Sequence, residues 1–151
     1  MSDNMGLETI DSSDYVSPTP INNNFQKLDA LGLDYVVESG RSGEWWYRKW
    51  KSGRAECGID DKNFGTVSVT KAWGALFQSG QMSFGAYPFS FAARPLSTIT
   101  LNYSDNTLHS SYVALVTTNS TTQAPKFTIM DPFSGSPNNV HFGIYVCGRY
   151  K

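Results

Sequence analysis

Hydrophobic residues near the start of the chain recur at the spacing of one helical face. Ile21, Phe25, Leu28 and Leu31 follow one another at steps of four, three and three residues, and Gly32 comes directly after them. Such steps predict an amphipathic helix, and glycine is typical of a helix end. A helix of about three turns is marginal alone. Its apolar face therefore needs either the core of this chain or the same helix of a second chain.

After Gly32 the pattern changes to short stretches rich in β-branched and aromatic residues, with turn residues roughly every eight to twelve positions. This spacing predicts an all-β fold, an antiparallel β-sandwich that is jelly-roll-like and follows the short N-terminal helix. The alternative is that the same strands close into a β-barrel. The predicted strands are 34–38, 44–50, 54–59, 66–73, 75–87, 97–103, 110–118, 126–130 and 140–149.

The clearest predicted hairpin joins the strands at 44–50 and 54–59. Its connector, Lys51-Ser52-Gly53, has glycine where a turn often needs a positive φ. Alternation places Trp46 and Trp50 on one face of the first strand and Trp45 on the other. We expect Trp46 and Trp50 to face the core. The second aromatic face either packs against a neighbouring subunit or stacks sugars, and packing is favoured because aromatic residues dominate cores and interfaces.

The composition limits the size and the partners of the fold. A chain of 151 residues corresponds to one domain with one core. Only 17% of the residues are charged and the net charge is -1, whereas Ser, Thr and Asn together supply 40 residues. The predicted surface is therefore polar but largely uncharged. Because it lacks a net basic field, we expect neither nucleic acid nor an anionic membrane as the main partner.

The first residues predict a tether. Residues 1–20 are polar, contain Pro18 and Pro20, and show no period that buries a face. We therefore divide the chain into an N-terminal tether and helix, 1–33, and a β-sandwich head, 34–151. No apolar run reaches the length of a membrane span, and the start lacks the basic and apolar segments of a signal peptide. We expect synthesis in the cytoplasm and no membrane insertion.

The few cysteines and histidines predict neither a metal site nor a cofactor. Cys57 and Cys147 are too few for a disulfide framework, and His109 and His141 are the only histidines. None of them has the spacing of a metal-ligand motif. Two reduced thiols are favoured over a Cys57–Cys147 bridge, because synthesis in the cytoplasm disfavours oxidation.

No catalytic signature is present. Motifs such as GxSxG, the phosphate-binding P-loop and GxGxxG are absent, and neither histidine lies in a recognisable triad signature. Three glutamates lie near the predicted hairpin, namely Glu38, Glu44 and Glu56. A pair of carboxylates suitable for glycoside hydrolysis therefore stays an open alternative. Glu44 and Glu56 are better explained as cross-strand partners of the basic residues Arg48, Lys49 or Arg54.

One acidic stretch is similar to part of a calcium loop. Asp60-Asp61-Lys62-Asn63 lacks the glycine and the distal glutamate that complete the EF-hand pattern. We expect a turn at these residues instead.

Three stretches resemble a known family. Residues 20–29, PINNNFQKLD, resemble the segment vNxNFqkLD. Residues 36–57, VVESGRSGEWWYRKWKSGRAEC, are similar to the start of vvEqGtsGiWtYRKWsSGiaECwg, and residues 141–151, HFGIYVCGRYK, resemble v.wyaiGrwK. These motifs are typical of distal tail-fibre or receptor-binding proteins of bacteriophages and prophages of gut bacteria. The chain departs from them at Gly58 and Tyr150, where tryptophan is usual.

The resemblance implies a trimeric, β-rich knob in a virion tail. Residues 1–33 would then serve attachment to upstream tail or baseplate proteins and trimerisation, and no catalytic residue is carried over. The implied function is a receptor-binding tip that recognises a host cell-surface polysaccharide without catalysis. Two alternatives stay open: a structural tail adaptor with no ligand beyond neighbouring tail proteins, and a small glycan hydrolase.

A saccharide site needs an aromatic plane beside side chains that donate and accept hydrogen bonds. Residues 102–109 combine both within eight positions, which makes Tyr103, Asp105, Asn106 and His109 the candidate saccharide-binding residues. Tyr103 would be the stacking surface and Asp105 an acceptor of hydroxyl protons. The alternative is a plain hairpin turn at Asp105-Asn106. The loops at 117–125 and 131–139 are further candidates.

Overall fold

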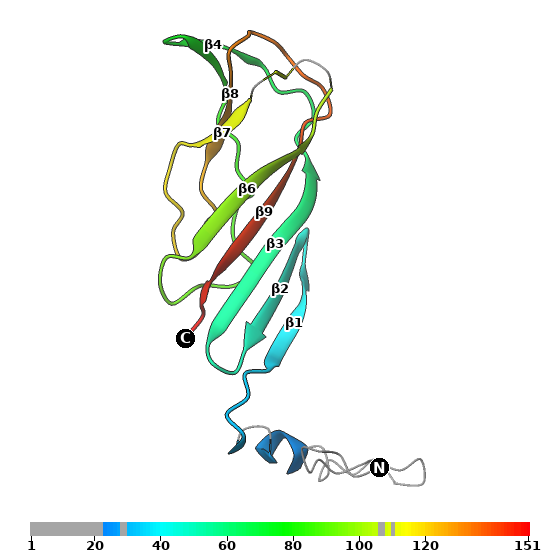
Figure 1. Cartoon of the computed structure of the whole chain (residues 1–151), viewed down its shortest axis with the longest axis vertical. Coiled ribbons are helices and arrows are strands. Elements are labelled where there is room, and N and C mark those ends of the chain that lie inside the picture. Colours follow the sequence, from blue (N-terminus) through cyan, green and yellow to red (C-terminus); the bar gives the residue numbers. More distant parts are fainter. Residues whose placement is uncertain (1–22, 28–29, 106–107, 110) are drawn as a thin grey trace, which may run out of the picture. The chain divides into compact units, whose positions relative to one another are not determined.

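The chain divides into two compact units, Met1–Tyr35 and Val36–Lys151, drawn in Figure 1. The structure is a computed structural model and describes residues 23–27, 30–105, 108–109 and 111–151. We call the second unit the head.

The first unit contains the predicted helix. Residues 23–27 and 30 are helical, and Gly32 follows with a φ of 65°. The helix end is therefore where the glycine predicted it. Ile21 and Leu28, the other two residues of the predicted apolar stripe, lie outside the described residues. Phe25 packs its ring against Tyr35 at 5.9 Å between centroids and still remains exposed, as does Leu31.

The head consists of two antiparallel sheets, which confirms the predicted all-β antiparallel fold. The strands are β1 Val36–Ser42, β2 Trp45–Trp50, β3 Arg54–Asn63, β4 Val69–Trp73, β5 Leu76–Ser79, β6 Leu96–Tyr103, β7 Tyr112–Leu115, β8 Phe127–Asp131 and β9 His141–Arg149. The five-stranded sheet has the order β1-β2-β3-β9-β6, and the four-stranded sheet has the order β4-β5-β8-β7. The predicted β2–β3 hairpin is confirmed, with Gly53 at a φ of 88°.

Two sequence predictions about the strands were wrong. Residues 60–63 do not form a turn, because β3 continues through them and shifts its register against β9 between Ile59 and Lys62. The stretch 75–87 is not one strand. After β5 ends at Ser79 it makes only isolated bridges, at Met82 and Ala86, since glycines at 80 and 85 interrupt the extended run.

The core lies between the two sheets and is dominated by aromatic rings. Phe127 of the four-stranded sheet meets Phe142 of the five-stranded sheet at 4.9 Å between ring centroids. Phe64 contacts both rings edge-on, each at 5.7 Å, and Phe84 stacks on Phe127 at 5.5 Å. Edge-to-face contacts of this kind add to the stabilisation that burial alone provides.

The tryptophans of β2 face the opposite way from our prediction. Trp45 is only 6% exposed and packs edge-on against Phe84 and Tyr87, whereas Trp46 and Trp50 are only half-buried. The pairing register between β2 and β3 explains this orientation. Tyr47 opposes the buried Cys57, and Trp46 opposes Gly58 on the other face. Because side chains alternate along a strand, Trp45 follows Tyr47 into the core.

Both cysteines are free thiols. Cys57 opposes Val146 on β9, while Cys147 opposes Glu56 on β3, so the two sulfur atoms point to opposite faces of the sheet. Burial, with a smaller contribution from the charge of Glu56, raises the pKa of the Cys57 thiol to about 12.

The head has two ends that carry different parts of the chain. Val36, where the chain enters, pairs with Trp50, and Gly53 accepts a hydrogen bond from the backbone N–H of Tyr150 at 2.9 Å. We call this the root end. At the opposite ends of β3, β9 and β6, His141 pairs with both Asn63 and Tyr103. We call this the far end, and Figure 1 shows β4, β7 and β8 on its side of the head.

Candidate ligand-binding far end

Tyr103 forms the centre of one group of side chains at the far end. It is 56% exposed, its ring meets that of His141 edge-on at 5.8 Å, and its hydroxyl donates to Asp105 Oδ1 at 3.4 Å. His141 Nδ1 lies 2.6 Å from Asp61 Oδ2. Asn102 Nδ2 donates to Asp61 Oδ1 at 3.0 Å. The tyrosine ring therefore stands beside a network that contains both donors and acceptors.

The bulge in β3 brings Asp61 into this group. The pairing of β3 with β9 skips Asp60 and Asp61, which frees the carbonyl of Asp60 from the sheet. Asn102 donates to that carbonyl at 2.8 Å and also to the Asp61 carboxylate. Hydrogen bonds from Asn102 and then His141 hold the pKa of the Asp61 carboxyl below its usual value. Asp61 is therefore an ionised acceptor at neutral pH.

His109 belongs to a second group at the far end, built around Asp131. This carboxylate is fully buried. It accepts the backbone N–H of His109 at 2.9 Å, the backbone N–H of Phe133 at 2.8 Å, and the hydroxyl of Ser111. The rings of His109 and Phe133 lie 4.6 Å apart between centroids with their planes tilted by 54°, and Phe133 is 58% exposed.

Burial alone would raise the pKa of Asp131, and the pKa is nevertheless lowered. The hydrogen bonds from Ser111 and from the backbone N–H groups of His109 and Phe133 together outweigh the cost of desolvation. The imidazole of His109, with Nδ1 at 3.5 Å from Asp131 Oδ1, adds a smaller effect in the same direction. Asp131 is therefore a charged residue that fixes the backbone of the loops around it.

The predicted saccharide-binding residues are divided between the two groups. Tyr103 and Asp105 lie together, His109 lies with Phe133 and Asp131, and Asn106 is outside the described residues. Sequence reasoning missed three polar side chains that belong to these groups and lie in no candidate stretch, namely Asp61, Ser111 and His141; Asn102 and Phe133 lie within the stretches 102–109 and 131–139 but were not named as contacts. A continuous β3 is the signal that would have found Asp61, because it carries that residue to the start of β9.

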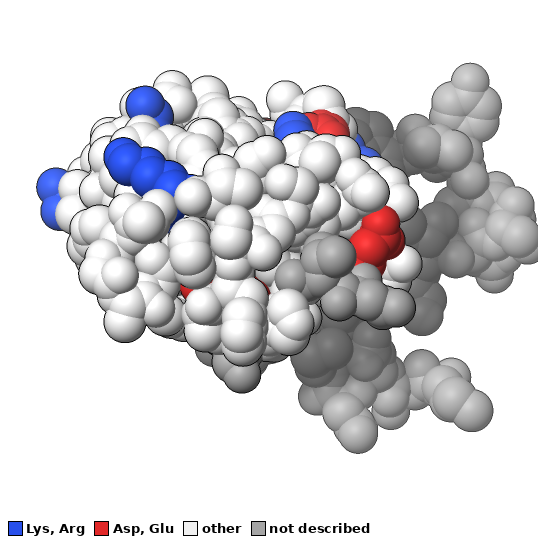
Figure 2. All heavy atoms as spheres, turned by 90° about the horizontal axis from the view of Figure 1, so that it is seen from above, with Lys and Arg blue, Asp and Glu red and all other residues white. Residues whose placement is uncertain are grey.

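The surface of the far end suits a neutral, hydroxyl-rich ligand. Seen from above in Figure 2, it is largely uncharged, with Lys and Arg gathered toward one side. Saccharides present apolar C–H faces and many hydroxyls, so they bind to exposed rings flanked by hydrogen-bonding groups. Tyr103 and Phe133 supply exposed rings, and the groups around them supply the donors and acceptors.

The three glutamates considered for hydrolysis are all engaged in ion pairs. Glu38 binds Lys49 at 2.8 Å, Glu44 binds Lys62, and Glu56 lies 3.6 Å from Arg48. The cross-strand pairing of Glu56 is confirmed, while Glu44 has a different partner from those predicted. The hydrogen bond from Lys49 lowers the pKa of Glu38. A general acid of a glycosidase needs a raised pKa, so Glu38 is unsuited to that role.

The described residues contain no group of three or more His, Cys, Asp or Glu side chains that could hold a metal ion. Within the same part of the chain, no helix has the length and apolar character needed to cross a bilayer.

Two solved structures resemble this chain. One is an N-truncated R1-type pyocin tail fibre, which is 16% identical with a TM-score of 0.52; the alignment covers 82% of this chain and 94% of that one. The other is a C-terminal fragment, residues 323–701, of the R1 pyocin fibre of P. aeruginosa, which is 14% identical with a TM-score of 0.54; the alignment covers 93% of this chain and 39% of that one. No family model and no curated protein matches the sequence. At these identities the likeness shows a shared fold.

Proposed function

We propose that this chain is the receptor-binding tip of a bacteriophage or prophage tail fibre and that it binds a saccharide of the host cell surface without catalysis. The observation that carries the proposal is the fold likeness to a pyocin tail fibre, which extends over 94% of that chain. The sequence motifs at 20–29, 36–57 and 141–151 support the same class of protein independently.

The saccharide site belongs at the far end. The chain enters the head at the root end, so a head attached through residues 1–33 presents its far end to the host. Tyr103 with Asp105, and His109 with Phe133, are the ring and hydrogen-bonding groups that would contact the sugar. The virion tail is the expected location, after synthesis in the bacterial cytoplasm.

The partners of the tip follow from the same proposal. Upstream tail or baseplate proteins would hold the N-terminal segment, and three copies of the chain would form a homotrimer. Phe25, Leu31 and Leu33 are exposed large apolar side chains in the first unit, which a second and third copy would cover. Three weak sites on one tip raise avidity by about 10² to 10⁴ without any new contact.

Adsorption to host cells tests the proposed site. The double variant Tyr103→Ala/Asp105→Ala should lose adsorption, because it removes a stacking ring and its neighbouring acceptor. Leu115→Ala/Lys126→Ala is a matched control that also removes one large exposed side chain and one charge, at the end of β7 away from Asp131. Equal adsorption by both variants, at unchanged melting temperatures, would exclude Tyr103 and Asp105 from the site.

Two further measurements separate the alternatives. A structural tail adaptor would assemble with tail proteins and bind neither host cells nor a glycan array. A small glycan hydrolase would release reducing ends from host cell-wall polysaccharide, whereas we expect no release above a buffer control.

A further inference from the structure

Four residues form a continuous row across the outer face of the five-stranded sheet. Trp46 on β2 opposes Gly58 on β3, Gly58 opposes Tyr145 on β9, and Tyr145 opposes Thr98 on β6. Directly opposed residues in antiparallel strands share a face. The row therefore places two aromatic rings on either side of a glycine, on the face that does not pack against the second sheet.

Gly58 lets the indole of Trp46 lie on the strand. A Cβ at this position would stand 2.7 Å from the Trp46 ring and 2.7 Å from the carbonyl oxygen of Ile144. The absence of a side chain gives the indole room to approach Tyr145, and the two rings lie 6.1 Å apart with an angle of 39° between their planes. Tyr145 remains 40% exposed. This is a departure from the family motif, where tryptophan is usual at position 58.

Each of the two rings donates one hydrogen bond from its polar group. Trp46 Nε1 donates to Asp60 Oδ1 at 2.8 Å, and the hydroxyl of Tyr145 donates to Glu56 Oε2 at 2.5 Å. These bonds use the polar edge of each ring and fix its orientation. The pair forms an oriented aromatic surface, which we call the Trp46–Tyr145 platform.

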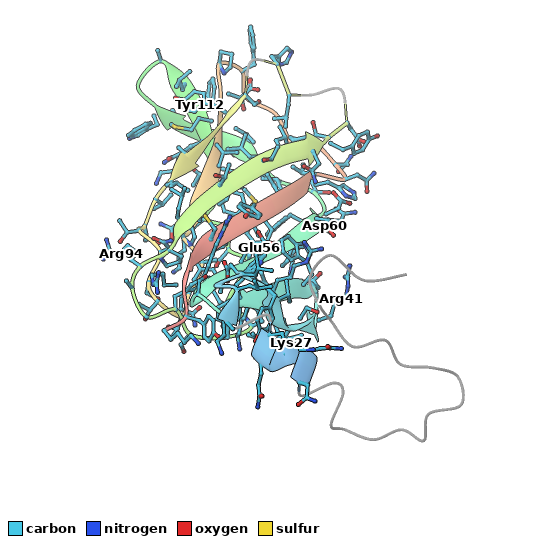
Figure 3. The ribbon with its side chains drawn as sticks, turned by 60° about the horizontal axis from the view of Figure 1, so that its bottom comes forward. Lys27, Arg41, Glu56, Asp60, Arg94 and Tyr112 are labelled. Carbon is cyan, nitrogen blue, oxygen red and sulfur yellow. The ribbon has the colours of Figure 1, made fainter. Side chains whose placement is uncertain are left out.

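Two hollows flank the platform, the first with mainly polar walls and the second with mainly apolar walls that include a few polar side chains. One depression of about 560 Å³ is lined by Arg41, Arg48 and Asp60 among others, and a second of about 230 Å³ is lined by Thr100 and Asn102. Trp46 and Asp60 line both hollows. Figure 3 shows Arg41, Glu56 and Asp60 along the sheet, with Arg94 apart from them.

The charges around the platform balance. Arg41 lies 3.9 Å from Asp60, and Arg48 lies 3.6 Å from Glu56, so two cations face two carboxylates. Such a surface offers donors and acceptors without a net charge that would select an ionic ligand. Carboxylates are depleted from the core of protein–protein interfaces, so the exposed Asp60 favours a small polar ligand over a second protein.

We infer that the Trp46–Tyr145 platform is a second saccharide site, which stacks the C–H face of an uncharged pyranose ring. Arg41 donates to its hydroxyls and Asp60 accepts from them. The inference rests on the proposed function for its class of ligand. It adds a site on the sheet face that adjoins the Tyr103 group of the far end through Asn102, so that one polysaccharide chain has two points of contact on each head.

The test uses oligosaccharides released by mild acid from the surface polysaccharide of a strain to which the wild-type chain adsorbs. Binding to the full chain is followed by calorimetry and by the indole N–H signal of Trp46 in NMR. We expect saturable shifts of that signal, and affinity about tenfold weaker or worse in Trp46→Ala and Tyr145→Ala, because each removes half of the platform. Trp73→Ala is the matched control, since Trp73 is 60% exposed on β4 and lies outside both sites.

The outcomes separate the platform from the far end. Wild-type adsorption without any shift at Trp46 would overturn the platform and leave the proposed function intact. A change of oligomeric mass in Trp46→Ala without loss of oligosaccharide affinity would overturn it as well, because the face would then join copies of the chain. If Trp46→Ala fails to fold, the NMR signal of the wild type and the Tyr145→Ala affinity decide. Absence of wild-type adsorption rejects both proposals.

Discussion

At the scale of single residues, Asp131 determines the structure of the far end. It is the last residue of β8 and is fully buried, yet it carries a charge. A buried charge is costly unless it is hydrogen-bonded. Here the backbone N–H groups of His109 and Phe133 and the hydroxyl of Ser111 satisfy it. One carboxylate therefore holds residues 109 and 111 together with residues 131 and 133, and the two pairs are distant from each other in sequence.

This arrangement predicts a loss of stability in acid. The pKa of Asp131 is lower in the folded chain than the value of about 3.9 expected when unfolded. Its stabilising contribution is fully present above about pH 4 and is lost as the pH falls through the folded pKa. Thermal melts from pH 7 down to pH 2 should show this decline. Asp131→Asn should be less stable at pH 7 and should show a flatter decline; an unchanged profile would contradict the prediction.

The tryptophans of β2 give a second prediction at this scale. Trp45→Ala should lower the free energy of unfolding by about 3–5 kcal/mol, because it removes a buried indole from the contacts with Phe84 and Tyr87. Trp46→Ala should cost less, since that side chain is only half-buried. Urea denaturation of the two variants compares them directly. A larger loss for Trp46→Ala would mean that the outer face of the sheet is covered in the assembled protein.

The same residues mark a limit of sequence analysis. Alternation predicts correctly that Trp46 and Trp50 share a face, but it does not say which face is inside, because β2 carries aromatic residues on both. The inner face is identified by the partner strand β3. Its buried residues Cys57 and Ile59 lie on the other face of the sheet from Trp46, so the Trp46 face is the outer one. Pairing between strands is a property of the fold, which the periodicity of one strand cannot supply.

At the scale of the elements, β3 has the largest influence on the surface of the head. It pairs with both β2 and β9, and its bulge at residues 60 and 61 redirects two carboxylates toward the outer face and the far end. Composition favours a turn for the stretch DDKN, because Asp and Asn are turn residues. Pairing with β9 overrides that preference by joining Lys62 to Phe142 and Asn63 to His141.

Gly58 in the middle of β3 gives a prediction for this element. Gly58→Ala should destabilise the head by about 1–3 kcal/mol, because the new methyl group meets the Ile144 carbonyl and the Trp46 ring at 2.7 Å. Gly80→Ala is the control, since a Cβ there meets no atom within 4 Å. Denaturant titration of both variants measures the difference. Equal stability of the two variants would show that β3 and Trp46 move apart without lowering the free energy of unfolding, which would contradict the prediction.

At the scale of the whole molecule, the separation of the chain into two units predicts how assembly and folding respond to truncation. The wild-type chain should scatter light as a homotrimer, about three times 16.7 kDa, at micromolar concentration. Deletion of residues 1–31 should weaken this assembly more than it lowers the melting temperature of the head, because the head contains its own aromatic core. A monomer mass for the full chain would contradict the trimer.

The fold was more predictable than the candidate site. Every predicted stretch overlaps a strand of the structure, because short runs of β-branched and aromatic residues between turns can be recognised from local information alone. The site requires contacts between distant residues. His141 and Asp61 meet across 80 positions of sequence, and His109 is separated from Tyr103 by the passage from one sheet to the other. Proximity along residues 102–109 was therefore a poor guide to proximity in space.

If the head binds a host saccharide as we propose, the crossing between β6 and β7 has a consequence for the exchange of host range. These strands belong to different sheets, and the described residues between them, 104–105, 108–109 and 111, lie outside both ladders. The backbone N–H of Asp105 donates to the carbonyl of Asn138, and the backbone N–H of His109 donates to the carboxylate of Asp131. Under the proposed function, a recombined or engineered segment that keeps Ser111 next to Asp131 would present new side chains to a different bacterial strain, while both sheets and the aromatic core stay as they are.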